Sequence, residues 1–123
     1  MKKPPFYKSV QFTINGLIWI LRNERNYQFH IVGLLINLFL IVFLGLSNLE
    51  AALILLCSFF VLVTETLNTC AEQICDYIQP NFDTKIGVIK DLAGGAVLLS
   101  VIAAVCVGIL VYWPYLKLYF YII

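Results

Sequence analysis

Charged residues are scarce in this chain. Asp, Glu, Lys and Arg make up 12% of its 123 residues, whereas 62% are hydrophobic. A soluble domain usually carries about twice that charged fraction. A soluble core of this length has too little interior to bury so much apolar surface, so lipid must surround much of the chain. The net charge is only +1, which excludes a broad basic face and argues against nucleic acid as a partner.

Several common catalytic motifs are also missing from the sequence. It has no Gly-rich phosphate loop and no Ser-His-Asp set. Its single histidine, His30, makes no His-rich metal site, and we interpret it as an interfacial residue. The four cysteines form no Cys-x-x-Cys pair and lie in apolar stretches. We therefore interpret them as packing residues, with zinc or disulfide roles as the alternatives.

Hydrophobic periodicity predicts an all-α membrane protein with four helices. The stretch 9–28 has separate apolar and polar faces and, with Trp19, is typical of an amphipathic helix in the membrane interface. Three further stretches, each near the roughly 20 residues that cross a bilayer, are expected to span it: 30–46, 51–78 and 85–113. Pro114 is expected to end the last span. We take residues 1–123 as a single integral membrane domain.

The basic residues predict the orientation in the membrane. Five precede the first span: Lys2, Lys3, Lys8, Arg22 and Arg25. Lys85 and Lys90 lie at the second turn, whereas the turn at 47–50 has none and only Lys117 follows the third span. By the positive-inside rule, the N-terminus and the second turn are cytoplasmic and the C-terminus is outside.

Polar residues of the second span form one stripe: Glu65, Asn68, Glu72 and Asp76. They lie within about 80° of each other on a helix that turns about 100° per residue. From Ala51, Glu65 lies about 21 Å into a hydrocarbon core about 30 Å thick, so it is about 9 Å inside the cytoplasmic edge. An acid at the helix centre costs roughly 3 kcal/mol on insertion scales. Glu65 therefore needs an offsetting partner or a function.

This stripe suggests a reaction at the cytoplasmic boundary. A buried base at Glu65 lies at the depth of a lipid hydroxyl, while Glu72 and Asp76 face a cytosolic ligand. Carboxylate oxygens suit magnesium, which bridges nucleotide phosphates. Lys90 offers a point charge for a phosphate, and Glu24 is near enough in topology to join the metal site. From spacing alone, structural pairing of helices and ion conduction are the alternatives.

Three motifs follow one another along the chain: Arg22-Asn-Glu-Arg-Asn-Tyr-Gln-Phe-His30, then Glu65-Thr-Leu-Asn-Thr-Cys-Ala-Glu72 followed by Asp76, then Lys90-Asp-Leu-Ala-Gly-Gly-Ala-Val97. In this order they resemble the bacterial diacylglycerol kinase and undecaprenol kinase family. The resemblance extends from about Tyr7 to Tyr115, and the first motif is similar to the branch that contains undecaprenol kinases. The chain departs from the family pattern at Asn15, where a basic residue is common, and in its longer, more aromatic tail after Pro114.

The resemblance implies an ATP-dependent lipid kinase of the bacterial inner membrane that works as a homotrimer with shared active sites. It implies that Glu65 is the base that takes the proton of the lipid hydroxyl, and that Glu24 and Glu72 hold Mg²⁺. The other residues that it places in the nucleotide pocket are Asn68, Asp76, Lys90 and Asp91. Undecaprenol is the expected substrate, with diacylglycerol as the alternative. An oligomeric cation channel or transporter with an acidic ring is the alternative of a different class.

A seam of small residues bears on the trimer. Four of them repeat every four residues along the third span: Ala96, Ser100, Ala104 and Gly108. Such a seam lets helices approach closely, either between subunits or within one chain.

Overall fold

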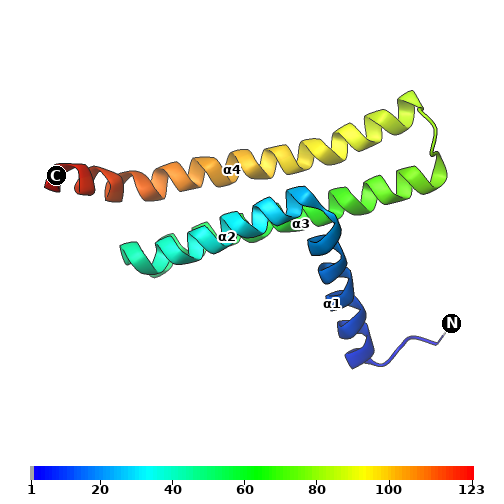
Figure 1. The fold of residues 1–123 in the computed structure, drawn as a ribbon, viewed down its shortest axis with the longest axis horizontal. Helices are drawn as coiled ribbons and strands as arrows, with labels where there is room; N and C mark the ends of the chain where they lie inside the picture. Colours follow the sequence, from blue (N-terminus) through cyan, green and yellow to red (C-terminus); the bar gives the residue numbers. More distant parts are fainter. Residues whose placement is uncertain (1) are drawn as a thin grey trace.

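The computed structural model describes residues 2–123. They form four helices in chain order: α1 (Phe6–Asn23), α2 (Arg25–Leu44), α3 (Asn48–Ile78) and α4 (Thr84–Ile122). Three of these, α2, α3 and α4, run alongside one another, and α1 projects steeply from them (Figure 1). The all-α class with three helices long and apolar enough to cross a membrane is confirmed.

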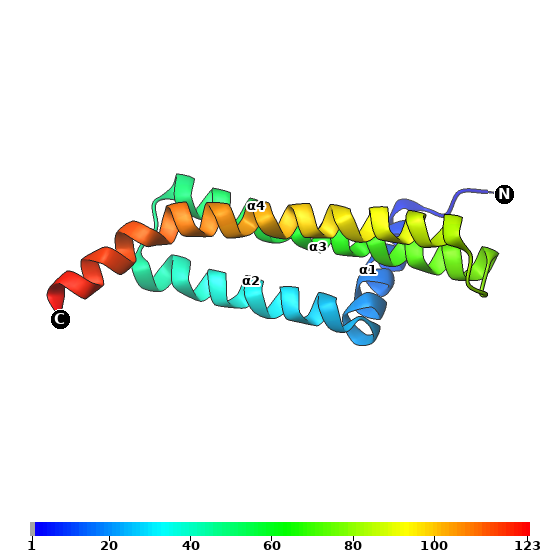
Figure 2. The same cartoon turned by 90° about the horizontal axis from the view of Figure 1, so that it is seen from above.

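The apolar surface of the bundle faces outward. In the most apolar stretch of each long helix, 6% of the residues of α2, 28% of those of α3 and 11% of those of α4 are buried inside the chain. The central helix is α3, which packs against both α2 and α4, whereas α2 and α4 stand apart (Figure 2). Exposed apolar surface of this extent requires lipid or further protein around it.

The corner between α1 and α2 lies at Glu24, in extended conformation with φ −109° and ψ 112°. This is earlier than the expected break near residue 28. Ile20 and Tyr27, on either side of the corner, are both buried in one cluster with Leu34 and Leu62. Burying apolar groups from both helices against α3 favours a bend between them, and the sequence periodicity did not reveal it.

The start of α3 is also earlier than expected. The Ser47 side chain accepts a hydrogen bond from the Glu50 backbone N–H at 3.2 Å, and the Glu50 carboxylate accepts one from the Ser47 N–H at 3.0 Å. This reciprocal capping box satisfies two N–H groups at the helix end. The helix therefore begins at Asn48 rather than near Ala51, and Glu50 lies in its first turn.

Pro114 does not end the helix that carries the third span; the end of the span itself stays a prediction. Helix α4 continues through Pro114 to Ile122, and its last turns bend away from the bundle (Figure 2). An apolar environment offers the backbone no other partners, so membrane helices tolerate proline better than soluble ones. The Tyr115 hydroxyl donates to Glu50 Oε2 at 2.6 Å, which ties the turn after the proline to the start of α3.

Polar contacts inside the bundle fix the register of its helices. The Tyr112 hydroxyl donates to Asn37 Oδ1 at 2.8 Å, and Asn37 Nδ2 donates to Ser58 Oγ at 3.3 Å, so α2, α3 and α4 are linked. The hydroxyls of Thr64 and Ser100 lie 2.8 Å apart between α3 and α4. Ser100, a member of the small-residue seam, thus packs within the chain. Whether the seam also joins subunits stays a prediction.

Candidate active site

The polar stripe of α3 faces the corner between α1 and α2. The buried cluster of Ile20, Tyr27, Leu34 and Leu62 holds this corner against α3. It brings Glu24 and the first turns of α2 to the level of Glu65, whose electrostatic neighbours include Glu24, His30 and Glu72. Two segments that are far apart in sequence, the α1–α2 corner and the polar stripe of α3, therefore lie near each other at Glu65.

Glu65 is the most deeply buried acid of the stripe, with 2% of its surface exposed. The basic side chain in contact with it is His30, whose Nε2 lies 3.8 Å from Glu65 Oε2. The His30 side chain is itself 25% exposed. Sequence reasoning missed this contact and treated His30 as a plain interfacial residue. Its position at the end of the first motif was the available signal.

Asn68 and Thr69 continue the buried part of the stripe. Asn68 Nδ2 donates to Glu72 Oε1 at 3.5 Å, which orients that carboxylate. Asn68 Oδ1 and Thr69 Oγ1 are buried without a hydrogen-bond partner among residues 2–123. A buried polar atom left unpaired costs about 1–3 kcal/mol, and such atoms in native structures call for an explanation. Both atoms therefore have unused hydrogen-bonding capacity beside Glu65 and Glu72.

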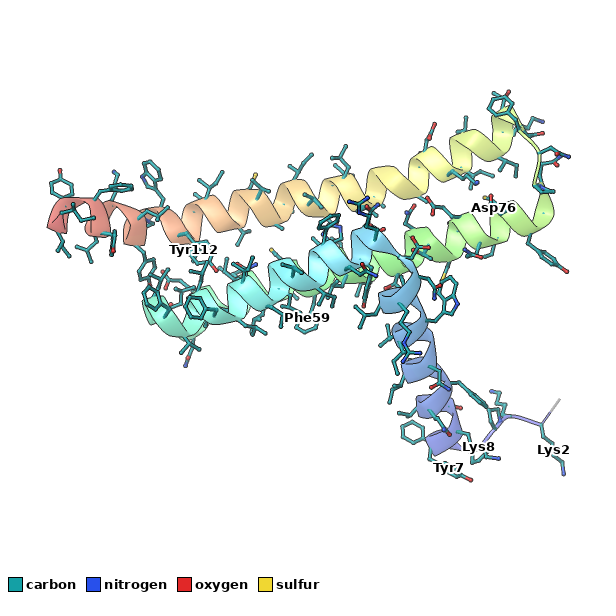
Figure 3. All side chains as sticks on the ribbon, in the orientation of Figure 1. Lys2, Tyr7, Lys8, Phe59, Asp76 and Tyr112 are labelled. Atoms are coloured by element: carbon teal, nitrogen blue, oxygen red, sulfur yellow. The ribbon has the colours of Figure 1, made fainter. Side chains whose placement is uncertain are left out.

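Asp76 and Lys90 form a salt bridge where α3 and α4 converge. Asp76 lies near the turn that joins these helices (Figure 3). Asp83 caps α4 by accepting from the backbone N–H groups of Lys85 and Ile86 at 2.9 and 3.1 Å, which sets the start of the helix that carries Lys90. A cavity of about 140 Å³ lies beside the Asp76–Lys90 pair.

The predicted nucleotide residues thus fall into two groups. Asn68, Glu72 and Glu24 lie around Glu65, and the Asp76–Lys90 pair lies toward the α3–α4 turn. One helical turn, about 6 Å, separates Glu72 from Asp76 along α3. Asp91 is exposed and forms no salt bridge within the part of the chain described. The structure brings it to the same end of the bundle without joining it to either group.

The donor set fits Mg²⁺ bound together with a nucleotide. Within residues 2–123, no three side chains of His, Cys, Asp or Glu are gathered into a complete metal site. Glu24 and Glu72 are half-buried and neither is engaged in a salt bridge among these residues. Magnesium typically takes one or two carboxylates, several waters and substrate phosphates. Two carboxylates outside any salt bridge, one of them bonded to Asn68, whose carbonyl oxygen is unpaired, match that pattern.

Two cavities border this cluster. One, of about 490 Å³, lies between α1 and α3 and is mostly apolar, with Trp19, Ile20 and Thr69 in its lining. The other, of about 240 Å³, lies among α2, α3 and α4 and includes His30 and Asn37. Glu65 itself lines neither cavity; the first reaches the stripe at Thr69 and the second at His30.

Comparison with known proteins gives a consistent result. The family model of the prokaryotic diacylglycerol kinases matches residues 11–112. The chain is 31% identical over 109 residues to the undecaprenol kinase of Bacillus subtilis, covering 89% of each protein. It is 30% identical over 106 residues to the diacylglycerol kinase of Synechocystis, covering 85% of this chain and only 61% of that longer protein.

The diacylglycerol kinase of Escherichia coli is more distant, at 26% identity over 110 residues and 88% of each chain. The family match extends over most of the chain and includes all three motifs, the buried carboxylate and the Asp76–Lys90 pair. The chain therefore belongs to the prokaryotic diacylglycerol kinase family, a family of lipid kinases.

Proposed function

We propose that this protein transfers the γ-phosphate of ATP to the hydroxyl of undecaprenol, giving undecaprenyl phosphate. The observation that carries the proposal is the buried carboxylate of Glu65, set among further carboxylates at one end of an apolar helix bundle. A soluble nucleotide and a membrane alcohol can meet only where the membrane borders the aqueous phase, which is the end of such a bundle. Diacylglycerol is the alternative substrate, because relatives that carry either name are similarly close.

Glu65 is the group best placed to accept the proton of the lipid hydroxyl. The hydroxyl oxygen attacks the γ-phosphorus, and its proton passes to the Glu65 carboxylate. The bond from the γ-phosphorus to the bridging oxygen breaks, and ADP leaves with that oxygen. Burial keeps water away from the carboxylate, which limits hydrolysis of ATP without transfer. A positioned general base of this kind contributes about 10²- to 10⁴-fold to the rate.

The remaining polar residues bind the nucleotide. In this proposal Glu24 and Glu72 hold Mg²⁺, which neutralises phosphate charge when bound. Asn68 offers its unpaired carbonyl oxygen near the same place, and Asp91 lies at the outer margin. Lys90 is paired with Asp76, and the nucleotide phosphates would compete with Asp76 for the ammonium group.

In this proposal the apolar cavity between α1 and α3 holds part of the lipid beside the stripe that carries Glu65. Its lining combines apolar side chains of α1 with the α3 face that carries Thr69, one turn beyond Glu65. An isoprenoid or acyl chain fits this lining, and the unpaired Thr69 hydroxyl can receive a polar group near the head of the lipid.

Orientation and assembly are part of the same proposal. The excess of basic residues before α2 and at the α3–α4 turn supports a cytoplasmic location of both and a C-terminus on the outer side. We also propose a homotrimer in the bacterial inner membrane, with each site shared between subunits. The wide apolar exposure of α2 and α4 supports this assembly, because helices of neighbouring copies can pack against such surface.

The direct test is lipid phosphorylation by the purified protein. It would be incubated in mixed micelles with Mg²⁺, γ-labelled ATP and either undecaprenol or diacylglycerol, and the lipid extract would be separated by chromatography. We expect labelled undecaprenyl phosphate, formed faster than phosphatidic acid. Label only in phosphatidic acid would overturn the choice of lipid. Label in neither lipid, together with cation flux in vesicles, would favour the channel function instead.

A further inference from the structure

We infer that His30 is a positioning residue for Glu65, holding the carboxylate in the orientation from which it accepts the proton of the lipid. This inference rests on the proposed function. It assigns a role to the only histidine of the chain, from the contact of that histidine with the most deeply buried acid.

The geometry of the pair supports this role. His30 Nε2 lies 3.8 Å from Glu65 Oε2, beyond hydrogen-bond length and within the range of an ion pair. Asn26, one helical turn before His30 on α2, borders the same carboxylate. Two side chains from one face of α2 therefore confine Glu65, which lies on α3 and is almost completely buried.

The surroundings explain why a positioning group is needed. Glu24 and Glu72 are both near enough to repel a charged Glu65. Two other basic side chains of this region have partners of their own: Lys90 pairs with Asp76, and the Arg25 guanidinium lies over the Phe29 ring, 5.5 Å from its centroid. His30 is thus the basic group that faces Glu65, and without it the carboxylate would rotate away from its acidic neighbours.

The fold sets the position of His30 firmly. Tyr27 and Leu34, one turn to either side of it on α2, are both buried in the cluster with Leu62 of α3. Packing of these two residues fixes the rotation and register of α2 against α3, and His30 is thereby directed to Glu65. Its ring also lines the cavity among α2, α3 and α4, so a small molecule has access to its place.

The test is a kinetic comparison of His30→Ala, His30→Gln and the control Val32→Ala, an exposed position on the same helix. We expect His30→Ala to lower kcat about 10- to 100-fold, the loss typical of a misplaced catalytic group, with KM values for ATP and lipid nearly unchanged. His30→Gln keeps an N–H donor and should retain more activity than His30→Ala. Free imidazole should restore part of the kcat of His30→Ala, and Val32→Ala should match the wild type.

The outcomes separate this inference from the proposed function. If the wild type is active and the His30→Ala variant has the same kcat, the positioning role is overturned and the kinase proposal stands. A lower kcat that neither glutamine nor imidazole improves would also overturn it, because a structural defect predicts that result. Circular dichroism and thermal unfolding of both variants check folding. A wild type that phosphorylates no lipid overturns the proposed function itself.

Discussion

The substitution Glu65→Gln should separate activity from stability. The amide has nearly the shape of the carboxylate and keeps one acceptor oxygen, so the packing around this buried side chain is preserved. It cannot accept a proton from an alcohol at neutral pH. The base is therefore lost while the fold stays, provided that Glu65 has the role we propose.

The expected magnitudes follow from the surroundings of Glu65. Loss of a general base lowers kcat by about 10²- to 10⁴-fold, which corresponds to about 3–5 kcal/mol in the barrier. The same change removes the negative charge of a buried side chain that lies near Glu24 and Glu72, and it alters the contact with His30. An acid within the membrane costs up to about 3 kcal/mol, so the variant should be as stable as the wild type or more stable.

The assay combines labelled phosphate transfer with ATP binding and thermal unfolding in the same detergent. The matched control is Glu50→Gln, the same chemical change at the other end of α3. Glutamine supports a capping box as glutamate does, and its oxygen can still accept from Tyr115, so we expect unchanged turnover. Wild-type turnover in Glu65→Gln would refute the proposed base. Equal loss of ATP binding would place Glu65 in the metal site instead.

Three further predictions address the remaining groups. Glu72→Gln should raise the Mg²⁺ concentration for half-maximal activity about tenfold, and an unchanged titration would contradict a metal-ligand role. Lys90→Met should raise the KM for ATP at least about tenfold in steady-state kinetics, because a charge-assisted hydrogen bond is worth about 1.5–3 kcal/mol, and it should leave the KM for lipid unaltered. An equal rise in both KM values would speak against a contact between Lys90 and a phosphate. Tyr112→Phe removes the hydrogen bond to Asn37 and should lower the free energy of unfolding, measured by denaturation in micelles, by about 0.5–2 kcal/mol without changing kcat. A free energy of unfolding equal to that of the wild type would mean that this bond contributes nothing to stability.

Much of the architecture could be predicted from the sequence, because hydropathy in lipid is a strong signal. The three spans and the amphipathic helix were found from apolar runs and from helical periodicity. The stripe of Glu65, Asn68 and Glu72 followed from the rotation of 100° per residue alone. These features depend on neighbours within one helix.

Contacts between helices could not be predicted in the same way. The corner at Glu24 depends on Ile20 and Tyr27 being buried together against Leu62, and the His30–Glu65 contact depends on the resulting register. Neither the corner nor the contact produces a periodic pattern in the sequence. The passage of α4 through Pro114 was missed for another reason: the rule that proline ends a helix comes from water-exposed segments, and lipid weakens it.

The central claim is that ATP from the cytoplasm meets a membrane alcohol at Glu65. It can be measured with γ-labelled ATP added to sealed membrane vesicles that contain the protein, either inverted or right-side-out. Our account predicts labelled lipid in inverted vesicles at once, and in right-side-out vesicles only after they are permeabilised. Equal labelling of sealed right-side-out vesicles would place the carboxylates on the outer side and contradict the account.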